Sequence, residues 1–161
     1  MTTAHTHETQ IEVDPRVPLV RITRDFDAPP EKVFRAHTDP DLVVRWLGPR
    51  GVTMTIDSWD CRTGGSYRYV HESDGQEYGF RGTFHEVRPD ELIVQTFTFE
   101  GFPEGVALER LTLTDLGDGR TRLVATSLVD SFEGRDAFIA SGMETGVVEG
   151  YERLDEVLAG R

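Results

Sequence analysis

The chain has 161 residues, a formal net charge of −12 at pH 7 and 37% hydrophobic residues. A chain of this length is expected to form one domain that buries roughly 70% of its unfolded surface. Its acidic charge disfavours nucleic acids and anionic membranes as partners. Because Cys61 is the only cysteine, an internal disulfide is excluded. No basic segment followed by an apolar run opens the chain, and no apolar stretch approaches about 18 residues, so we expect a cytoplasmic protein.

Residues 1–16 are polar and contain Pro15, which predicts a flexible N-terminal tail with a short extended piece at Ile11–Val13 as its only regular structure. Residues 17–161 are then a single domain. His5 and His7 make a poor metal site, because two flexible imidazoles lack further ligands. The chain contains no phosphate-binding or dinucleotide-binding glycine motif, no zinc-protease motif and no serine-nucleophile motif, so we expect neither metal nor cofactor.

The first domain segment, Leu19–Phe26, alternates between apolar and polar residues and predicts a strand. Two short helices follow in DAPPEKVFRAH and TDPDLVVRW, with prolines suited to first helical turns, and Gly48-Pro49 closes them. From Gly51 onward, apolar and polar residues alternate with a period of two. Turn residues then separate six further predicted strands, and such short links indicate an antiparallel meander; the strands are Val52–Trp59, Ser66–His71, Glu77–Val87, Leu92–Phe99, Val106–Thr114 and Arg122–Val129.

The stretch from Gly134 to Leu158 predicts one long amphipathic helix. Its apolar arc comprises Ile139, Met143, Val147, Tyr151, Leu154 and Leu158. Gly142, Gly146 and Gly150 follow one edge of that arc, although each glycine costs about 1 kcal/mol relative to alanine inside a helix. Either the sheet approaches this edge closely, or the edge leaves room for a cavity. The sequence leaves both possibilities open.

These elements predict an α+β domain in which a curved, seven-stranded antiparallel sheet wraps around the long C-terminal helix. Two short helices follow the first strand. Only the C-terminal helix is large enough to cover the concave face of the sheet.

Three stretches resemble one protein family: RITRDFDAPPEKVFRAHTDPDLVVRWLGP, the motif formed by Asp57, Asp60, Arg62, Gly64 and Gly65, and GMETGVVEGYERLDEVL. The family is the START-like, Bet v 1-like superfamily, also called SRPBCC. The most similar branch resembles the C-terminal domain of activators of the heat-shock-protein-90 ATPase. The resemblance implies a helix-grip fold with an apolar cavity between sheet and helix. Its members bind hydrophobic ligands, and some cyclise or hydrate aromatic substrates. Where relatives often have two tryptophans, this chain has Trp46-Leu47.

Strand alternation, combined with this resemblance, predicts an aromatic pocket for a small hydrophobic or aromatic molecule. We expect Trp46, Tyr69, Phe80, Phe97, Met143, Val147 and Tyr151 to line it. The alternative is an ordinary core in which the tyrosine hydroxyls bind backbone groups.

Glu109 and His71 are the candidate catalytic residues. Glu109 lies on a strand that continues with Leu111 and Leu113, so an inward carboxylate would be desolvated and could transfer protons. Alternatively, Glu109 faces water or pairs with Arg81. His71 ends a strand near a turn and is expected at the cavity rim, where solvation is more common than catalysis.

Three functions follow from these features. The first is binding of an unidentified hydrophobic small molecule without established catalysis. The second is a polyketide-cyclase-like or hydratase-like enzyme that uses the same cavity. The third is a co-chaperone-like protein-binding module, which would expose an apolar patch. A homodimer is compatible with all three, and the sequence specifies neither the ligand nor the oligomeric state.

Overall fold

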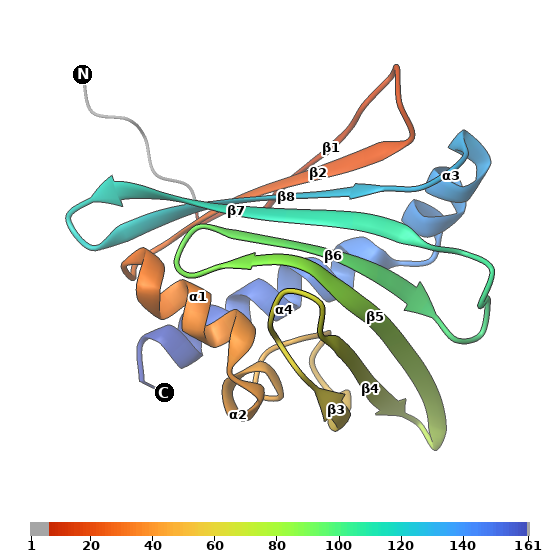
Figure 1. Cartoon of the computed structure of the whole chain (residues 1–161), viewed down its shortest axis with the longest axis horizontal. Coiled ribbons are helices and arrows are strands. Elements are labelled where there is room, and N and C mark those ends of the chain that lie inside the picture. The colour runs from red at the N-terminus through yellow and green to blue at the C-terminus, as the bar shows by residue number, and fades with distance from the viewer. Residues whose placement is uncertain (1–6, 161) are drawn as a thin grey trace.

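The computed structural model describes residues 7–160 as eight strands and four helices. The strands form one antiparallel sheet in the order β1-β2-β8-β7-β6-β5-β4-β3, and the sheet curves around α4 (Figure 1). The strands are β1 (Gln10–Val13), β2 (Leu19–Phe26), β3 (Thr53–Trp59), β4 (Ser66–Ser73), β5 (Gln76–Arg88), β6 (Leu92–Phe99), β7 (Ala107–Gly117) and β8 (Arg120–Leu128). The helices are α1 (Pro30–Thr38), α2 (Pro40–Val43), α3 (Phe132–Ala140) and α4 (Met143–Leu158). Within the described range, no helix is long and apolar enough to cross a membrane.

The α+β class, the curved antiparallel sheet and the two short helices after the first domain strand are confirmed. The expected strand number of seven is wrong by one. The additional strand, β1, pairs with β2 from Gln10↔Thr23 to Val13↔Val20 and forms one edge of the sheet. It occupies part of the stretch expected to be a tail, and residues 1–6 of that stretch lie outside the described range. Its position agrees with the short extended piece expected at Ile11–Val13, which here pairs with β2 and so becomes part of the sheet.

The prediction of a single helix over Gly134–Leu158 is wrong, because the structure contains two helices there. Gly142 separates them with a φ of +90°, a left-handed conformation that ends α3 and cannot continue an α-helix. The apolar arc nevertheless spans the break. Ile139 of α3 and Met143 of α4 pack against the same buried cluster as Tyr151 and Leu154. The sequence pattern therefore identifies the buried face correctly but not the interruption.

The glycine edge of α4 packs against the segment between α2 and β3, rather than against the sheet. A Cβ atom at Gly150 would lie 3.3 Å from the backbone oxygen of Trp46 and 3.4 Å from the nitrogen of Gly48. At Gly146 it would lie 3.6 Å from Cδ of Pro49, an ordinary van der Waals distance. Only Gly150 is thus needed for a close backbone approach.

This difference predicts opposite outcomes for two alanine substitutions in α4. Gly146→Ala should raise the free energy of unfolding by about 0.5–1 kcal/mol, since it removes backbone entropy from the unfolded chain without a steric clash. Gly150→Ala should give no such gain, because the new methyl group meets the Trp46 carbonyl. Urea unfolding of both variants measures the difference. Equal stabilisation by the two would show that the loop does not restrict α4.

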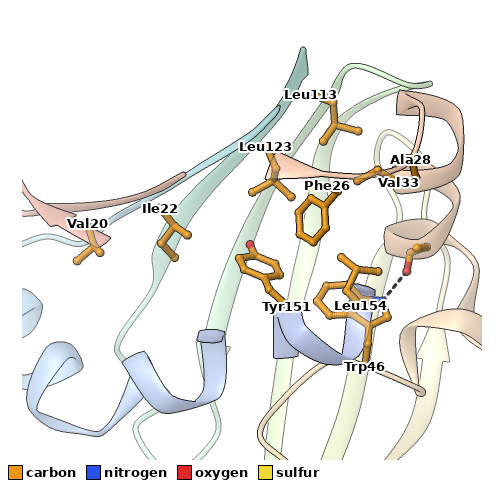
Figure 2. Close-up of a cluster of buried hydrophobic side chains, with 11 residues drawn as sticks. Val20, Ile22, Phe26, Ala28, Val33, Trp46, Leu113, Leu123, Tyr151 and Leu154 are labelled. Carbon is orange, nitrogen blue, oxygen red and sulfur yellow. Dashed lines mark hydrogen bonds between the residues drawn. The ribbon is translucent and has the colours of Figure 1, made fainter. Parts of the chain in front are cut away.

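The buried apolar residues form two clusters. One joins α4 and α1 to the strands β2, β7 and β8, and Figure 2 shows Trp46 and Tyr151 within it. Trp46 donates from Nε1 to the Ala36 carbonyl at 2.8 Å and stacks on Tyr151 with ring centroids 6.1 Å apart. The second cluster centres on β4, β5 and β6, with Tyr67, Tyr69, Phe84 and Ile93. Phe34, Leu47 and Leu111 pack against both clusters and connect them.

Candidate functional site

Three polar side chains lie side by side across the inner face of the sheet. Gln95 of β6 pairs with Glu109 of β7, which pairs in turn with Ser127 of β8. Gln95 donates from Nε2 to Oε1 of Glu109 at 3.1 Å, and Ser127 donates from Oγ to Oε2 at 3.2 Å. We call these residues the polar trio. The same transverse row continues with Phe84 on one side and Val20 on the other, both buried, so the polar trio is enclosed by apolar residues.

The orientation of the Gln95 amide follows from its second contact. Tyr67 uses its hydroxyl proton to donate to the Thr96 carbonyl at 2.7 Å. The Tyr67 oxygen can therefore only accept from Gln95, 3.3 Å away, which places Nε2 on this side and also toward Glu109. Gly82 leaves room for the hydrogen bond between Tyr67 and Thr96, because a Cβ there would lie 2.6 Å from the Tyr67 hydroxyl and 2.0 Å from the Thr96 oxygen.

The carboxylate of Glu109 faces inward, as the strand alternation predicts. Surrounding protein desolvates it although the residue keeps some accessible surface, and this desolvation raises the pKa of Glu109; the hydrogen bonds from Gln95 and Ser127 act in the opposite direction. The alternative pairing with Arg81 is not what the structure shows. Arg81 lies 3.9 Å from Glu100 instead.

Two tyrosines bring free hydroxyls toward this carboxylate. Burial, and then the negative charge of Glu109, raises the pKa of both Tyr69 and Tyr151. Neither hydroxyl has a hydrogen-bond partner within residues 7–160. The fully buried side-chain atoms without a partner in that range belong to other residues, namely Arg24, His37, His71 and Arg120. The two hydroxyls therefore reach space that water can enter, and Figure 2 shows the Tyr151 oxygen pointing away from Trp46 toward the strands.

The predicted pocket residues divide between the two clusters. Trp46, Tyr151, Met143 and Val147 belong to or pack against the cluster beside α4. Tyr69, Phe80 and Phe97 belong to or pack against the other. Phe80 joins its neighbours through stacked rings, with centroids 5.2 Å from Tyr69 and 5.5 Å from Phe97. Phe80, Phe97, Met143 and Val147 are only half-buried, although they face the interior from both layers.

His71 is half-buried at the edge of the aromatic group. Its ring lies 5.1 Å from Tyr69 and 5.3 Å from Phe80, and Gly48 leaves the space that the ring occupies. Desolvation, followed by the charge of Arg153, lowers the pKa of His71. Within the described part of the chain, no hydrogen bond or ion pair joins it to Glu109, so the two candidate catalytic residues do not form a pair.

Other residues considered in the sequence stay outside this site. Arg62 donates to both carboxylate oxygens of Asp60 at 3.0 Å, an ion pair that precedes the turn at Gly64. Cys61 is half-buried, and burial raises the pKa of its thiol to about 11, so the reactive thiolate is disfavoured. Among residues 7–160, no cluster of three or more histidine, cysteine or acidic side chains could hold a metal ion.

Ser127 is a member of the polar trio that the sequence does not single out. Its partner Glu109 is recognisable, because a carboxylate interrupts an apolar alternation. A serine carries no comparable signal, since it is common on either face of a strand. Only the pairing Glu109↔Ser127 places its hydroxyl on the carboxylate.

Residues 27–159 match the family model described as activator of Hsp90 ATPase homolog 1-like protein. The chain belongs to this family. This match confirms the resemblance noted in the sequence, and similar solved structures have the same fold. A search of curated proteins finds no match.

Solved structures similar to this family member come from several bacteria. A protein from Rhodobacter sphaeroides is 30% identical with a TM-score of 0.84, and the alignment covers 94% of this chain and 98% of that one. Protein Ms6760 from Mycobacterium smegmatis is 24% identical with a TM-score of 0.84, covering 93% and 96%. DynU16, a protein of the dynemicin biosynthetic locus, is 24% identical with a TM-score of 0.66 and covers 88% of this chain but 47% of its own.

Proposed function

We propose that this protein binds a hydrophobic or aromatic small molecule between its sheet and α4. The supporting observation is that inward-facing side chains from both layers stay partly accessible. Phe80 and Phe97 of the sheet, and Met143 and Val147 of α4, keep accessible surface although they pack against buried clusters. A core closed by side-chain packing would bury such residues almost completely. The free hydroxyls of Tyr69 and Tyr151 support the same conclusion.

The lining of this binding site suits a ligand with rings or an alkyl body. Aromatic residues supply most of its surface, while Glu109 and the two tyrosine hydroxyls supply a few convergent polar groups. This combination is typical of small-molecule sites, in which apolar contacts give affinity and polar groups fix orientation. The lining residues that we propose are Trp46, Tyr69, Phe80, Phe97, Met143, Val147 and Tyr151.

The test is to fill the space from the helix side. Val147→Trp should reduce the affinity for the neutral fluorescent probe N-phenyl-1-naphthylamine at least tenfold, because the indole occupies the volume of the probe. Thr145→Trp, on the exposed face of the same helix, is the matched control and should leave the affinity unchanged. Circular dichroism verifies that both variants are folded. Equal probe affinity in Val147→Trp and the original protein would contradict the proposed site.

An enzyme acting in the same space is the second candidate, and the desolvated carboxylate of Glu109 favours it. A carboxyl group with a raised pKa can act as a general acid or base. The direct partners of Glu109 are Gln95 and Ser127, however, and neither supplies a second titrating group. Deuterium exchange of bound 2-indanone in D2O, present in the original protein and lost in Glu109→Gln, would favour the enzyme over simple binding.

A protein-binding role has a separate observation in its favour. Four exposed apolar side chains lie at the β5–β6 end of the sheet and in the loop to β7: Tyr78, Phe99, Phe102 and Val106. Phe102 is the most exposed of them at 63%. Exposed apolar groups of this kind are common at protein interfaces. A sedimentation experiment at several concentrations would reveal a homodimer, and Phe102→Ser should weaken any association through this surface.

A further inference from the structure

Glu109 differs from Arg24, another inward-facing charge of the sheet, in having no counter-ion among residues 7–160. Arg24 of β2 is 1% exposed and donates to both oxygens of Asp155, at 2.9 and 2.6 Å. Glu109 forms no ion pair with any residue from 7 to 160. Its two oxygens instead accept hydrogen bonds from an amide and a hydroxyl, both neutral. The negative charge of the ionised carboxylate is therefore uncompensated.

Among residues 7–160, the titratable side chains on which the charge of Glu109 acts are tyrosines, which are uncharged at neutral pH. They are Tyr67 and Tyr69 of β4 and Tyr151 of α4, and burial keeps the pKa of each above its ordinary value. Gln95 and Ser127 do not titrate. Arg24 acts electrostatically on Tyr151, but Asp155 already neutralises it. Burying a charge without a partner is unfavourable, so a cation arriving at this position would be stabilised.

The Gln95 amide is oriented to donate to one carboxylate oxygen of Glu109. Because Tyr67 fixes the Gln95 amide, Nε2 can only donate to Oε1 of Glu109. Oε1 is thus an acceptor, and a proton on Glu109 would sit on Oε2, where the Ser127 hydroxyl can accept it. The aromatic faces of Tyr69, Phe80 and Phe97 lie beside the same space, and such faces attract cations in addition.

We propose that the ligand of this site is a hydrophobic amine whose ammonium group pairs with Glu109 and whose apolar body contacts the aromatic side chains. This inference rests on the proposed binding function and names the class of molecule bound. A neutral hydroxyl could accept or donate one hydrogen bond at the same place, but it would leave the carboxylate charge uncompensated. The two free tyrosine hydroxyls then serve as further polar contacts for the ligand.

The experiment compares two probes of nearly the same shape, 1-naphthylmethylamine and 1-naphthalenemethanol, by displacement of N-phenyl-1-naphthylamine at pH 7. The amine should bind at least tenfold more tightly than the alcohol. Glu109→Gln should remove this preference while keeping the binding of the alcohol. Glu77→Gln is the matched control, because it makes the same change of charge at an exposed position of β5 and should keep the preference.

Each outcome separates the inference from the binding function. If both probes bind equally and Glu109→Gln changes neither, the amine assignment is overturned while the binding function stands. If neither probe nor the fluorescent reporter binds, both are overturned. If Glu109→Gln does not fold, the affinities of the original protein for the two probes are measured at several pH values instead. Protonation of Glu109 at falling pH should weaken the amine more than the alcohol, and parallel curves would overturn the assignment.

Discussion

Asp155→Ala should lower the free energy of unfolding by about 3 kcal/mol, because it leaves the Arg24 guanidinium buried without a counter-ion. The Arg24 side chain is 2% exposed and that of Asp155 is 32% exposed. Two hydrogen bonds, at 2.9 and 2.6 Å, join them between β2 and α4. After the substitution, Arg24 keeps its bond to the Asp25 carbonyl and its position over the Phe26 ring, but neither compensates a full charge.

The neighbouring residue of α4 provides the matched control. Glu156 accepts from Arg50 at 2.9 Å, and both side chains are about half exposed. Glu156→Ala should therefore cost less than about 1 kcal/mol, as expected for an ion pair in water. Arg24→Met should also cost less than Asp155→Ala, since it removes the buried charge and leaves only a hydrated carboxylate. Urea unfolding of the three variants compares these values. A loss below 1 kcal/mol for Asp155→Ala would show that the buried guanidinium does not depend on its partner.

The residue pattern predicts the sheet well because its signals are local. Both Leu19–Phe26 and Leu92–Phe99 begin and end where the alternation indicates, and the inward face of β4 and β5 is the expected one. Alternation puts Tyr78 and Phe99 on the same face as Phe80 and Phe97, but they lie at its open end with 40% and 38% exposure. Alternation assigns a face to each residue, but it does not show how far the covering helix extends.

The candidate site could be predicted only in part. Glu109 is visible as a carboxylate within an apolar strand, and its inward direction follows from the alternation. The absence of an arginine partner depends on which strands become neighbours, and so do the contacts with Ser127 and Gln95. These pairings join residues that are 14 and 18 positions apart along the chain. No local pattern encodes them.

The glycine edge of the C-terminal helix is a case in which a regular sequence pattern suggests more than the structure contains. Its three regularly spaced glycines suggest one shared role, yet the structure gives each a different one. Gly142 separates two helices, Gly146 makes ordinary contact with Pro49, and Gly150 admits the backbone of Trp46 and Gly48. Because Trp46 stacks on Tyr151 beside this contact, the close approach at Gly150 also positions one wall of the proposed binding site.

The stability of the protein should fall as the pH drops from about 6.5 to about 4, and His37 is the residue responsible for a large part of this loss. Burial lowers the pKa of His37 from 6.5 to about 4. Its Nδ1 donates to the Val33 carbonyl at 2.8 Å, whereas its Nε2 is buried without a partner among the described residues. Protonation would add a charge and an unsatisfied donor next to the ring of Trp46, 4.8 Å away.

The direction follows from proton binding by the two states. Between pH 6.5 and 4 the unfolded chain binds a proton at this histidine and the folded protein does not, so each unit of falling pH favours unfolding. The full effect is about 3 kcal/mol, reached near pH 4 and absent above pH 7. Urea unfolding of the original protein and of His37→Phe at several pH values isolates this contribution. As the pH falls, the original protein should lose more unfolding free energy than His37→Phe. His37→Gln repeats the comparison with a side chain that can still donate to Val33. Parallel stability curves would mean that His37 accepts its proton in the folded protein, with Trp46 and α1 rearranged to admit the charge.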